Sequence, residues 1–187
     1  MGFHTFDIDR ADALEDAATR YRYCSREELH GLVAPDSGMI LADLGSGTGF
    51  YTDDLAPHAG TVFAVDVQAA MHDRYREKGV PANVELVAAD AADLPFGADA
   101  LDAAVSTMTF HEFADPDALA EVARVLRPGG RLVTVDWDRA GAGEAGPPRE
   151  ETYGLDDAVS LQTDAGFVVE RATARPETFV TVARLDD

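Results

Sequence analysis

Hydrophobic positions along the chain follow two patterns that alternate from one segment to the next. Short continuous apolar runs are typical of strands buried on both faces of a sheet, whereas apolar residues three or four positions apart are typical of helices that pack on one side. The predicted strands are 39–44, 61–65, 84–87, 101–106, 131–136, 167–171 and 178–185. The predicted helices are 52–58, 69–78, 116–126 and 153–165. This alternation predicts an α/β fold with a mainly parallel sheet and right-handed crossovers.

The beginning of the chain has helical spacing instead of strand-like runs. Apolar side chains within 6–32 recur at roughly helical intervals, and Ser25 stands before an acidic first turn as an N-cap would. We expect two helices here. The chain is short enough for one core, so we interpret residues 1–35 as a helical segment attached to a single α/β domain at 36–187.

Cysteine content and apolar runs limit the class of protein. Cys24 is the single cysteine, which excludes an intrachain disulfide and a cysteine-based metal cluster, and we expect no metal site. No apolar run approaches the roughly 20 residues that cross a bilayer, and the N-terminus lacks the basic and apolar regions of a signal peptide. These features predict a cytoplasmic protein.

The charge is strongly unbalanced. The chain has 35 acidic and 15 basic residues, a formal net charge of −20, and Lys78 is its one lysine. Such a surface repels nucleic acid and anionic membranes, so neither is expected as a partner. One interpretation is a halophilic protein, because at molar salt the Debye length falls to about 3 Å and repulsion between carboxylates is screened. The alternative is an acidic protein from a GC-rich genome, which also favours Asp, Ala and Arg.

A glycine-rich loop follows the first predicted strand. It runs from Asp43 through Gly45, Gly47 and Gly49, and its glycines permit a tight turn and close approach of a ligand to the backbone. The helix after the loop offers free N–H groups to an anionic group. Asp66 ends the next strand, where an acidic side chain commonly accepts hydrogen bonds from ribose hydroxyls. Together these features indicate a nucleotide-type site.

The glycine spacing separates two kinds of ligand. The loop reads G-x-G-x-G, whereas a dinucleotide-binding loop reads G-x-G-x-x-G, and Asp43 suits a cationic ammonium better than a pyrophosphate. An NAD-dependent oxidoreductase is also disfavoured because the single lysine, Lys78, leaves no Tyr-x-x-x-Lys catalytic pair.

Five motifs give the chain a specific resemblance. They are DLGSGTG at 43–49, AVD at 64–66, DA with LPF at 90–96, LDAAV at 101–105 and VLRPGGRL at 125–132. In these motifs, their order and their spacing, the sequence resembles the class I S-adenosylmethionine-dependent methyltransferases of the type 11 group. The resemblance implies a Rossmann-like, doubly wound, mainly parallel sheet with an antiparallel C-terminal strand pair. It also implies a structural turn at 127–130.

The same resemblance implies S-adenosylmethionine as cofactor and methyl transfer as activity. The methionine moiety would lie on the glycine loop near Asp43, and the ribose would lie on Asp66. Adenine would bind near Asp90, and the methyl group would point toward Thr107. The implied cofactor-binding residues are Asp43, Gly45, Ser46, Gly47, Gly49, Asp66, Val67, Asp90, Ala91 and Thr107.

Titratable side chains follow the fourth predicted strand, at the edge where α/β sheets hold their ligands. His111 is the candidate general base, with Glu112 beside it. The alternative is a histidine that only caps or packs at a helix start. Asp136 and Trp137 are candidates for the acceptor pocket, and the Gly- and Pro-containing stretch 141–148 is a loop that either connects or covers.

The methyl acceptor is expected to be a small molecule, since the chain is acidic and has no added domain of the kind that larger family members use for RNA or protein. His4, Phe6 and Arg10 make the N-terminal segment a candidate lid over the cofactor. A protein that binds the cofactor without catalysis is the second alternative, because a fold and a cofactor do not guarantee turnover. The sequence leaves the oligomeric state open.

Overall fold

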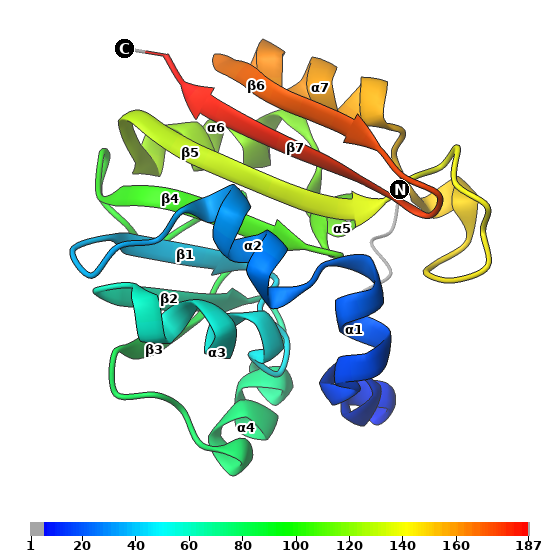
Figure 1. Cartoon of the computed structure of the whole chain (residues 1–187). Helices are drawn as coiled ribbons and strands as arrows, with labels where there is room; N and C mark the ends of the chain where they lie inside the picture. The colour runs from blue at the N-terminus through cyan, green and yellow to red at the C-terminus, as the bar shows by residue number, and fades with distance from the viewer. Residues whose placement is uncertain (1–5, 187) are drawn as a thin grey trace.

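A single mixed sheet organises the structure (Figure 1). The computed structural model describes residues 6–186, and within them seven strands pair in the order β3-β2-β1-β4-β5-β7-β6. The strands are β1 (Ile40–Leu44), β2 (Thr61–Asp66), β3 (Val84–Ala88), β4 (Leu101–Thr107), β5 (Leu126–Trp137), β6 (Phe167–Ala174) and β7 (Thr178–Leu185). Strands β1 to β5 run parallel, and β7 lies antiparallel between β5 and β6. The predicted α/β class and its antiparallel C-terminal pair are confirmed.

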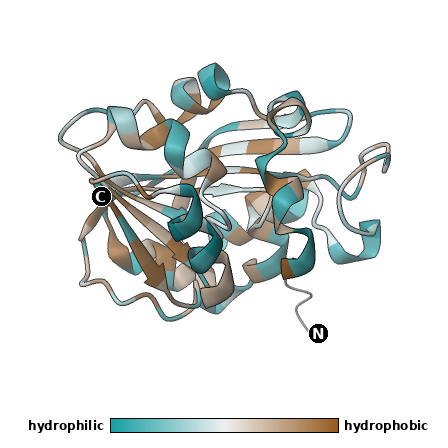
Figure 2. Cartoon of the chain, turned by 90° about the horizontal axis from the view of Figure 1, so that it is seen from below, coloured by the Kyte–Doolittle hydropathy of each residue, from teal (hydrophilic) through white to brown (hydrophobic). Residues whose placement is uncertain are grey.

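Helices cover both faces of this sheet. The α-helices are α1 (Ala17–Tyr23), α2 (Arg26–Val33), α3 (Phe50–Leu55), α4 (Ala69–Lys78), α5 (Phe110–Phe113), α6 (Pro116–Val125) and α7 (Leu155–Asp164). The 3-10 helices are η1 (Ile8–Glu15), η2 (Ala56–His58) and η3 (Arg149–Glu151). Helices α2 and α3 lie on one face, and α6 and α7 lie on the other (Figure 1). Figure 2 shows hydrophobic residues concentrated in the sheet and hydrophilic residues on the surrounding helices.

The central position of β1 in the sheet explains why the sequence of this strand is continuously apolar. Leu41 packs into the core on the α2 side, whereas Ala42 and Leu44 pack into the core on the α6 side. Side chains alternate between the two faces of a strand, and both faces of this sheet are covered. The strand therefore ends in the interior of the molecule, and it delivers the glycine loop to the edge where β2 and β4 also end.

The N-terminal segment is helical, as expected. Ser25 caps α2 by accepting a hydrogen bond from the backbone amide of Glu28 at 3.2 Å, and Asp16 caps α1. The 3-10 helix η1 precedes them, so the described part of the segment contains three short elements instead of two. His4 lies outside the described residues. Within 6–186, no helix has the length and apolar character needed to cross a membrane.

Strand β5 begins earlier than predicted. It starts at Leu126, which pairs with Leu101, and the register then shifts so that Arg131 pairs with Ala103. The segment 127–130 is therefore an excursion within the strand, with Gly129 at φ 76°. The resemblance implied a structural turn here, and the structure instead has a register shift within one strand at these residues. Sequence reasoning missed the early start of β5, because the partner strand β4 continues without interruption past the bulge.

Two helix boundaries also differ from the prediction. Helix α7 begins at Leu155 because Tyr153 pairs with Asp138 in an isolated bridge, and the amide of Gly154 donates to Asp157. The predicted helix at 52–58 begins two residues earlier, directly after the glycine loop, and its last turn is the 3-10 helix η2.

Candidate functional site

A cavity of about 240 Å³ opens where β1, β2 and β4 end. The strand order reverses at this edge, because the chain proceeds from β1 to β2 and β3 and then returns to β4 on the other side of β1. Open α/β sheets bind ligands at such a switch point. Eight predicted cofactor residues line the cavity: Gly45, Ser46, Gly47, Asp66, Val67, Asp90, Ala91 and Thr107. The other two, Asp43 and Gly49, are buried outside its lining.

The glycine loop is held by backbone hydrogen bonds. The amides of Gly45 and Ser46 both donate to the carbonyl oxygen of Val65 at 2.9 Å. Gly45 has φ 73°, and a Cβ there would lie 2.1 Å from the side chain of Thr109. Gly49 has φ 81°, and a Cβ there would lie 2.1 Å from the ring of Tyr75. Both positions therefore require glycine, Gly45 at the cavity and Gly49 in the packing behind it.

Asp66 joins the loop to the end of β2. Its carboxylate accepts hydrogen bonds from the backbone amides of Gly47 and Gln68, both at 2.8 Å. Burial raises the pKa of Asp66, and these two amides oppose the increase. Asp66 is 8% exposed and lines the cavity, so one carboxylate both shapes the glycine loop and faces the cavity.

Asp43 lies within β1, behind the loop. Its Oδ2 accepts a hydrogen bond from the hydroxyl of Thr52 at 2.6 Å, and its Oδ1 is buried without a hydrogen-bond partner among the described residues. Burial raises the pKa of Asp43 to about 6, against the lowering effects of Thr52 and of the positive charge on Arg20. The predicted contact of Asp43 with an ammonium group stays a prediction.

The cavity has a second side that sequence reasoning largely missed. Phe6, Leu14 and Arg20 line it from the N-terminal segment, and of these only Phe6 was a candidate. The guanidinium of Arg20 lies 4.8 Å from the ring centroid of Tyr51, and its buried Nε has no hydrogen-bond partner among the described residues. Helical spacing predicted the helix around Arg20, but no local motif marks the direction of its side chain.

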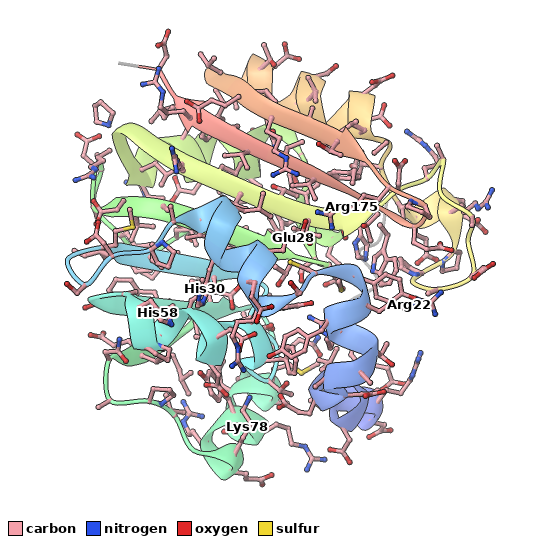
Figure 3. The ribbon with its side chains drawn as sticks, in the orientation of Figure 1. Arg22, Glu28, His30, His58, Lys78 and Arg175 are labelled. Carbon is pink, nitrogen blue, oxygen red and sulfur yellow. The ribbon has the colours of Figure 1, made fainter. Side chains whose placement is uncertain are left out.

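Several ion pairs fasten the N-terminal segment, and two of them join it to opposite parts of the molecule. Lys78 of α4 lies 3.0 Å from Glu15, the last residue of η1, and Glu15 also accepts a hydrogen bond from Thr48. In the other of these two pairs, Arg175 contacts Glu28 of α2, and Figure 3 shows these two side chains next to each other. The segment is therefore linked to α4 near the cavity and to the C-terminal strand hairpin farther away.

His111 is directed toward Asp136. Its Nδ1 lies 3.0 Å from both carboxylate oxygens of Asp136, and its backbone amide donates to Oδ2 at 2.6 Å. Burial lowers the pKa of His111, but the adjacent Asp136 carboxylate and the acidic Glu112 and Glu151 outweigh burial, so the pKa is raised overall. His111 is not among the residues that line the cavity, whereas Glu112 is.

The other acceptor-pocket candidates lie away from the cavity lining. Asp136 is fully buried against His111. The Trp137 ring packs against Tyr23 with centroids 4.8 Å apart, and Gly146 of the 141–148 loop lies against that same ring. The loop thus packs on the end of β5 and on the N-terminal segment, and it does not line the cavity of the described structure.

Comparisons with known proteins agree with this geometry. Residues 42–134 match the family described as a methyltransferase domain. Demethylmenaquinone methyltransferase from Corynebacterium kroppenstedtii is 35% identical over 120 residues, which cover 64% of this chain and 49% of that protein. An uncharacterized methyltransferase-like protein from Schizosaccharomyces pombe is 35% identical over 135 residues, which cover 72% of this chain and 51% of that protein. This chain spans about half the length of these two relatives.

Solved structures share the whole fold. A SAM-dependent methyltransferase from Aquifex aeolicus matches 97% of this chain and 100% of its own, with a TM-score of 0.87 and 28% identity. The strand order, the glycine loop and the cavity define a Rossmann-like α/β protein with a nucleotide-type ligand site. Within that class, the chain belongs to the class I S-adenosylmethionine-dependent methyltransferases and carries a type 11 methyltransferase domain. The family implies S-adenosylmethionine as the cofactor.

Proposed function

We propose that the chain binds S-adenosylmethionine in the cavity at the ends of β1, β2 and β4 and transfers its methyl group to a small-molecule acceptor. The observation that carries the proposal is the convergence of the glycine loop, Asp66 and Asp90 on one cavity. These three features lie at the ends of different strands, so their meeting follows from the topology and not from closeness in sequence.

The adenosine part of the ligand fits the region around β2. Asp66 reaches the cavity with its carboxylate fixed by two backbone amides, which is the arrangement needed to accept hydrogen bonds from a pair of hydroxyls. Val67 is 56% exposed, and it offers an apolar surface to a flat ring. Asp90 and Ala91 lie on the same lining and would hold the polar edge of that ring.

The amino-acid part fits the other end of the cavity. Ser46 Oγ and Arg20 Nε are buried lining atoms without hydrogen-bond partners among the described residues, and Asp43 Oδ1 is a third such atom behind the loop. Buried polar groups without partners are costly, so a ligand that satisfies them would bind favourably. Arg20 would hold the carboxylate of a zwitterion, and the loop in front of Asp43 would hold its ammonium group.

The chain's own contribution to the chemistry is enclosure and orientation. S-adenosylmethionine supplies a methyl group activated by a positively charged sulfur. Phe6, Leu14 and Phe50 present apolar surface to the cavity and exclude water from it. Because the Asp136 carboxylate can only accept hydrogen bonds, it holds the proton of neutral His111 on Nδ1, and in that form Nε2 is free to accept a proton. His111 therefore stays our candidate base, acting beside the cavity.

The proposal also covers the methyl acceptor and the conditions in which the protein works. Demethylmenaquinone methyltransferase is the name of one relative, so a demethylated quinone is the first class of acceptor to screen. The net charge of −20 supports adaptation to high salt and disfavours nucleic acid and membrane partners, and the location in our proposal is the cytoplasm. A non-catalytic cofactor-binding protein is the second candidate, since His111 points away from the cavity lining.

Calorimetry with S-adenosylmethionine, S-adenosylhomocysteine and NAD tests the proposal. We expect both sulfur compounds to bind, and Asp66→Ala to weaken S-adenosylmethionine binding by about 1–3 kcal/mol, because two hydroxyls lose a buried acceptor. Production of S-adenosylhomocysteine with a panel of small acceptors then distinguishes an enzyme from a binding protein. Tight binding of NAD without binding of S-adenosylmethionine would overturn the proposal.

A further inference from the structure

Glu112 occupies a special position among the acids of the cavity. Asp66, Asp90 and Asp115 also line it, but each of these carboxylates accepts a hydrogen bond from a nearby backbone amide and so stabilises a local turn or helix start. Glu112 projects from the short helix α5 and has no such local role. Its half-buried side chain faces the cavity, and its backbone partner, Phe6, comes from the distant N-terminal segment.

The groups around Glu112 come from four different elements. Asp66 of β2 and Asp136 of β5 add negative charge, His111 of α5 adds positive charge, and the backbone of Phe6 donates from the N-terminal segment. Burial, together with the charges of the two aspartates, raises the pKa of Glu112 to about 7, against the lowering effects of His111 and of the Phe6 backbone. The other charged lining groups are Arg20, Asp90 and Asp115. Near neutral pH, the carboxyl group of Glu112 is therefore partly neutral and partly ionised.

A ligand's charge decides which form is favoured. A cation in the cavity favours the ionised carboxylate and displaces its proton to solvent, whereas a neutral group leaves the proton in place. S-adenosylmethionine and S-adenosylhomocysteine share the adenosine and the amino-acid ends. They differ by one methyl group and by the positive charge on sulfur, so a comparison of the two isolates the response to that charge.

We propose that Glu112 is the residue by which the cavity distinguishes the positively charged methyl donor from its neutral thioether product. This inference rests on the proposed function, because it assumes that both molecules occupy the cavity. With Glu112 ionised, the donor binds more tightly than the product. Loss of the sulfur's charge removes that attraction, and the carboxylate regains a fraction of a proton from solvent while the product is still bound.

Calorimetry tests this without any knowledge of the acceptor. Donor and product are titrated separately into the whole protein at pH 7, each in two buffers with different ionisation enthalpies, so that the heats report the number of protons released. We expect the wild-type protein to release a larger fraction of a proton with the donor than with the product, since any release from Asp43 is common to both ligands. In Glu112→Gln, this difference in proton release should disappear and the donor-to-product affinity ratio should fall by about 3- to 10-fold, the size expected for one partly buried charge pair.

The dependence on pH gives a second measurement. Ionised Glu112 favours the donor, so the ratio of donor affinity to product affinity should increase as the pH rises from 6 to 8, whereas ionisation of Asp43 acts on the ammonium group that both ligands share. Glu151→Gln is the matched control, because Glu151 is exposed, lies outside the cavity lining and acts on the same His111. It removes the same charge from the same neighbourhood, and it should keep both the proton release and the affinity ratio of the wild-type protein.

The outcomes separate the two levels of the proposal. If neither molecule binds the wild-type protein, the proposed function fails. If both bind, and Glu112→Gln binds the product as the wild-type protein does while keeping the same affinity ratio and proton release, only the role of Glu112 is overturned. Product binding by the variant also shows that it is folded. An equal effect of Glu151→Gln would also overturn the role of Glu112, because the difference in affinity and proton release would then come from the total negative charge of the region.

Discussion

The cavity has a floor and a roof that are built in different ways. The floor consists of turns at the ends of β1, β2 and β3, and its contacts are backbone hydrogen bonds such as those from Gly45 and Ser46 to Val65. The roof consists of Phe6, Leu14 and Arg20, and side chains fasten it. Gln68 donates to the carbonyl oxygen of Phe6 at 3.0 Å, and the Glu15 carboxylate of η1 contacts α4.

This difference assigns separate physical roles to the two sides. Backbone hydrogen bonds in a sheet edge persist as long as the fold persists, so the floor has the stability of the core. The roof depends on a few ion pairs and aromatic contacts of a segment that lacks strand pairing, so the loss of these contacts would leave the hydrogen bonds of the sheet intact. The floor would fix the ligand's position, and the roof would control its access.

Gly45→Ala should break the floor and give the largest effect. A Cβ at this position would lie 2.1 Å from the side chain of Thr109, and the backbone φ of 73° is unfavourable for alanine. Strain and overpacking add, so the free energy of unfolding should fall by about 2–4 kcal/mol, as measured by urea denaturation. Binding of S-adenosylmethionine should be lost together with the shape of the loop.

Gly31→Ala is the control for this substitution. Gly31 lies inside α2, and a Cβ there would have no atom within 4 Å. Alanine is the better helix former, so the free energy of unfolding should rise by up to about 1 kcal/mol. A Gly45→Ala protein with the stability and the ligand affinity of the wild type would show that the floor tolerates side chains, contrary to the geometry.

His111→Ala tests the short helix α5 beside the cavity. The change leaves the buried Asp136 without its ring partner and should lower the free energy of unfolding by about 1–3 kcal/mol at pH 6. The folded pKa of His111 is raised, so its stabilising contribution is complete below about pH 6.5 and is lost as the pH rises through the raised value. Urea denaturation at pH 6 and pH 9 should therefore show a smaller difference at pH 9.

The same variant addresses catalysis once an acceptor is known. If His111 is the general base, turnover should fall by about 100-fold or more while cofactor affinity stays nearly constant. A variant that is less stable but turns over at the wild-type rate per folded molecule, with an unchanged pH profile, would identify His111 as a packing residue. Its contact with Asp136 fits either role.

The sequence was most informative about the floor. Strand, glycine loop and terminal acid are neighbours along the chain. Their backbone conformations require particular residue types that the sequence shows, such as glycines where φ is positive. Alternation of apolar runs with helical spacing predicted each strand, because both faces of the sheet are covered. The early start of β5 was not predicted, since its first pair, Leu126 with Leu101, precedes a bulge.

The roof could not be predicted in the same way. The contacts of Glu15 with Thr48 and Lys78 join residues 33 and 63 positions apart, and no periodicity encodes such pairs. Nothing in the sequence distinguishes Arg20 from a surface arginine. Only the fold shows that it lines the cavity. For the adjacent pair His111 and Glu112, the sequence indicated the right turn of helix, but the choice of which side chain faces the cavity depends on Asp136, 25 positions away.

The salt dependence of stability should separate the roof from the molecule as a whole. With a net charge of −20, the wild-type protein should gain thermal stability from dilute buffer to molar KCl, because repulsion between carboxylates is screened. A melting temperature that is constant over this range would favour the GC-rich explanation of the acidic composition. The contact of Lys78 with Glu15 is an attraction, so the same screening should weaken it.

Lys78→Met should therefore have the smallest effect, and one confined to low salt. Lys78 Nζ lies 3.0 Å from Glu15 and 2.9 Å from Asp53, and loss of these half-buried pairs should cost about 0.5–1 kcal/mol and speed amide hydrogen exchange in η1. In molar KCl the difference from the wild-type protein should nearly vanish. Arg74→Met removes the same charge from an exposed pair with Glu77 on the same helix, and it should leave exchange in η1 unchanged. Equal exchange in both variants at low salt would mean that packing, and not Lys78, holds the roof in place.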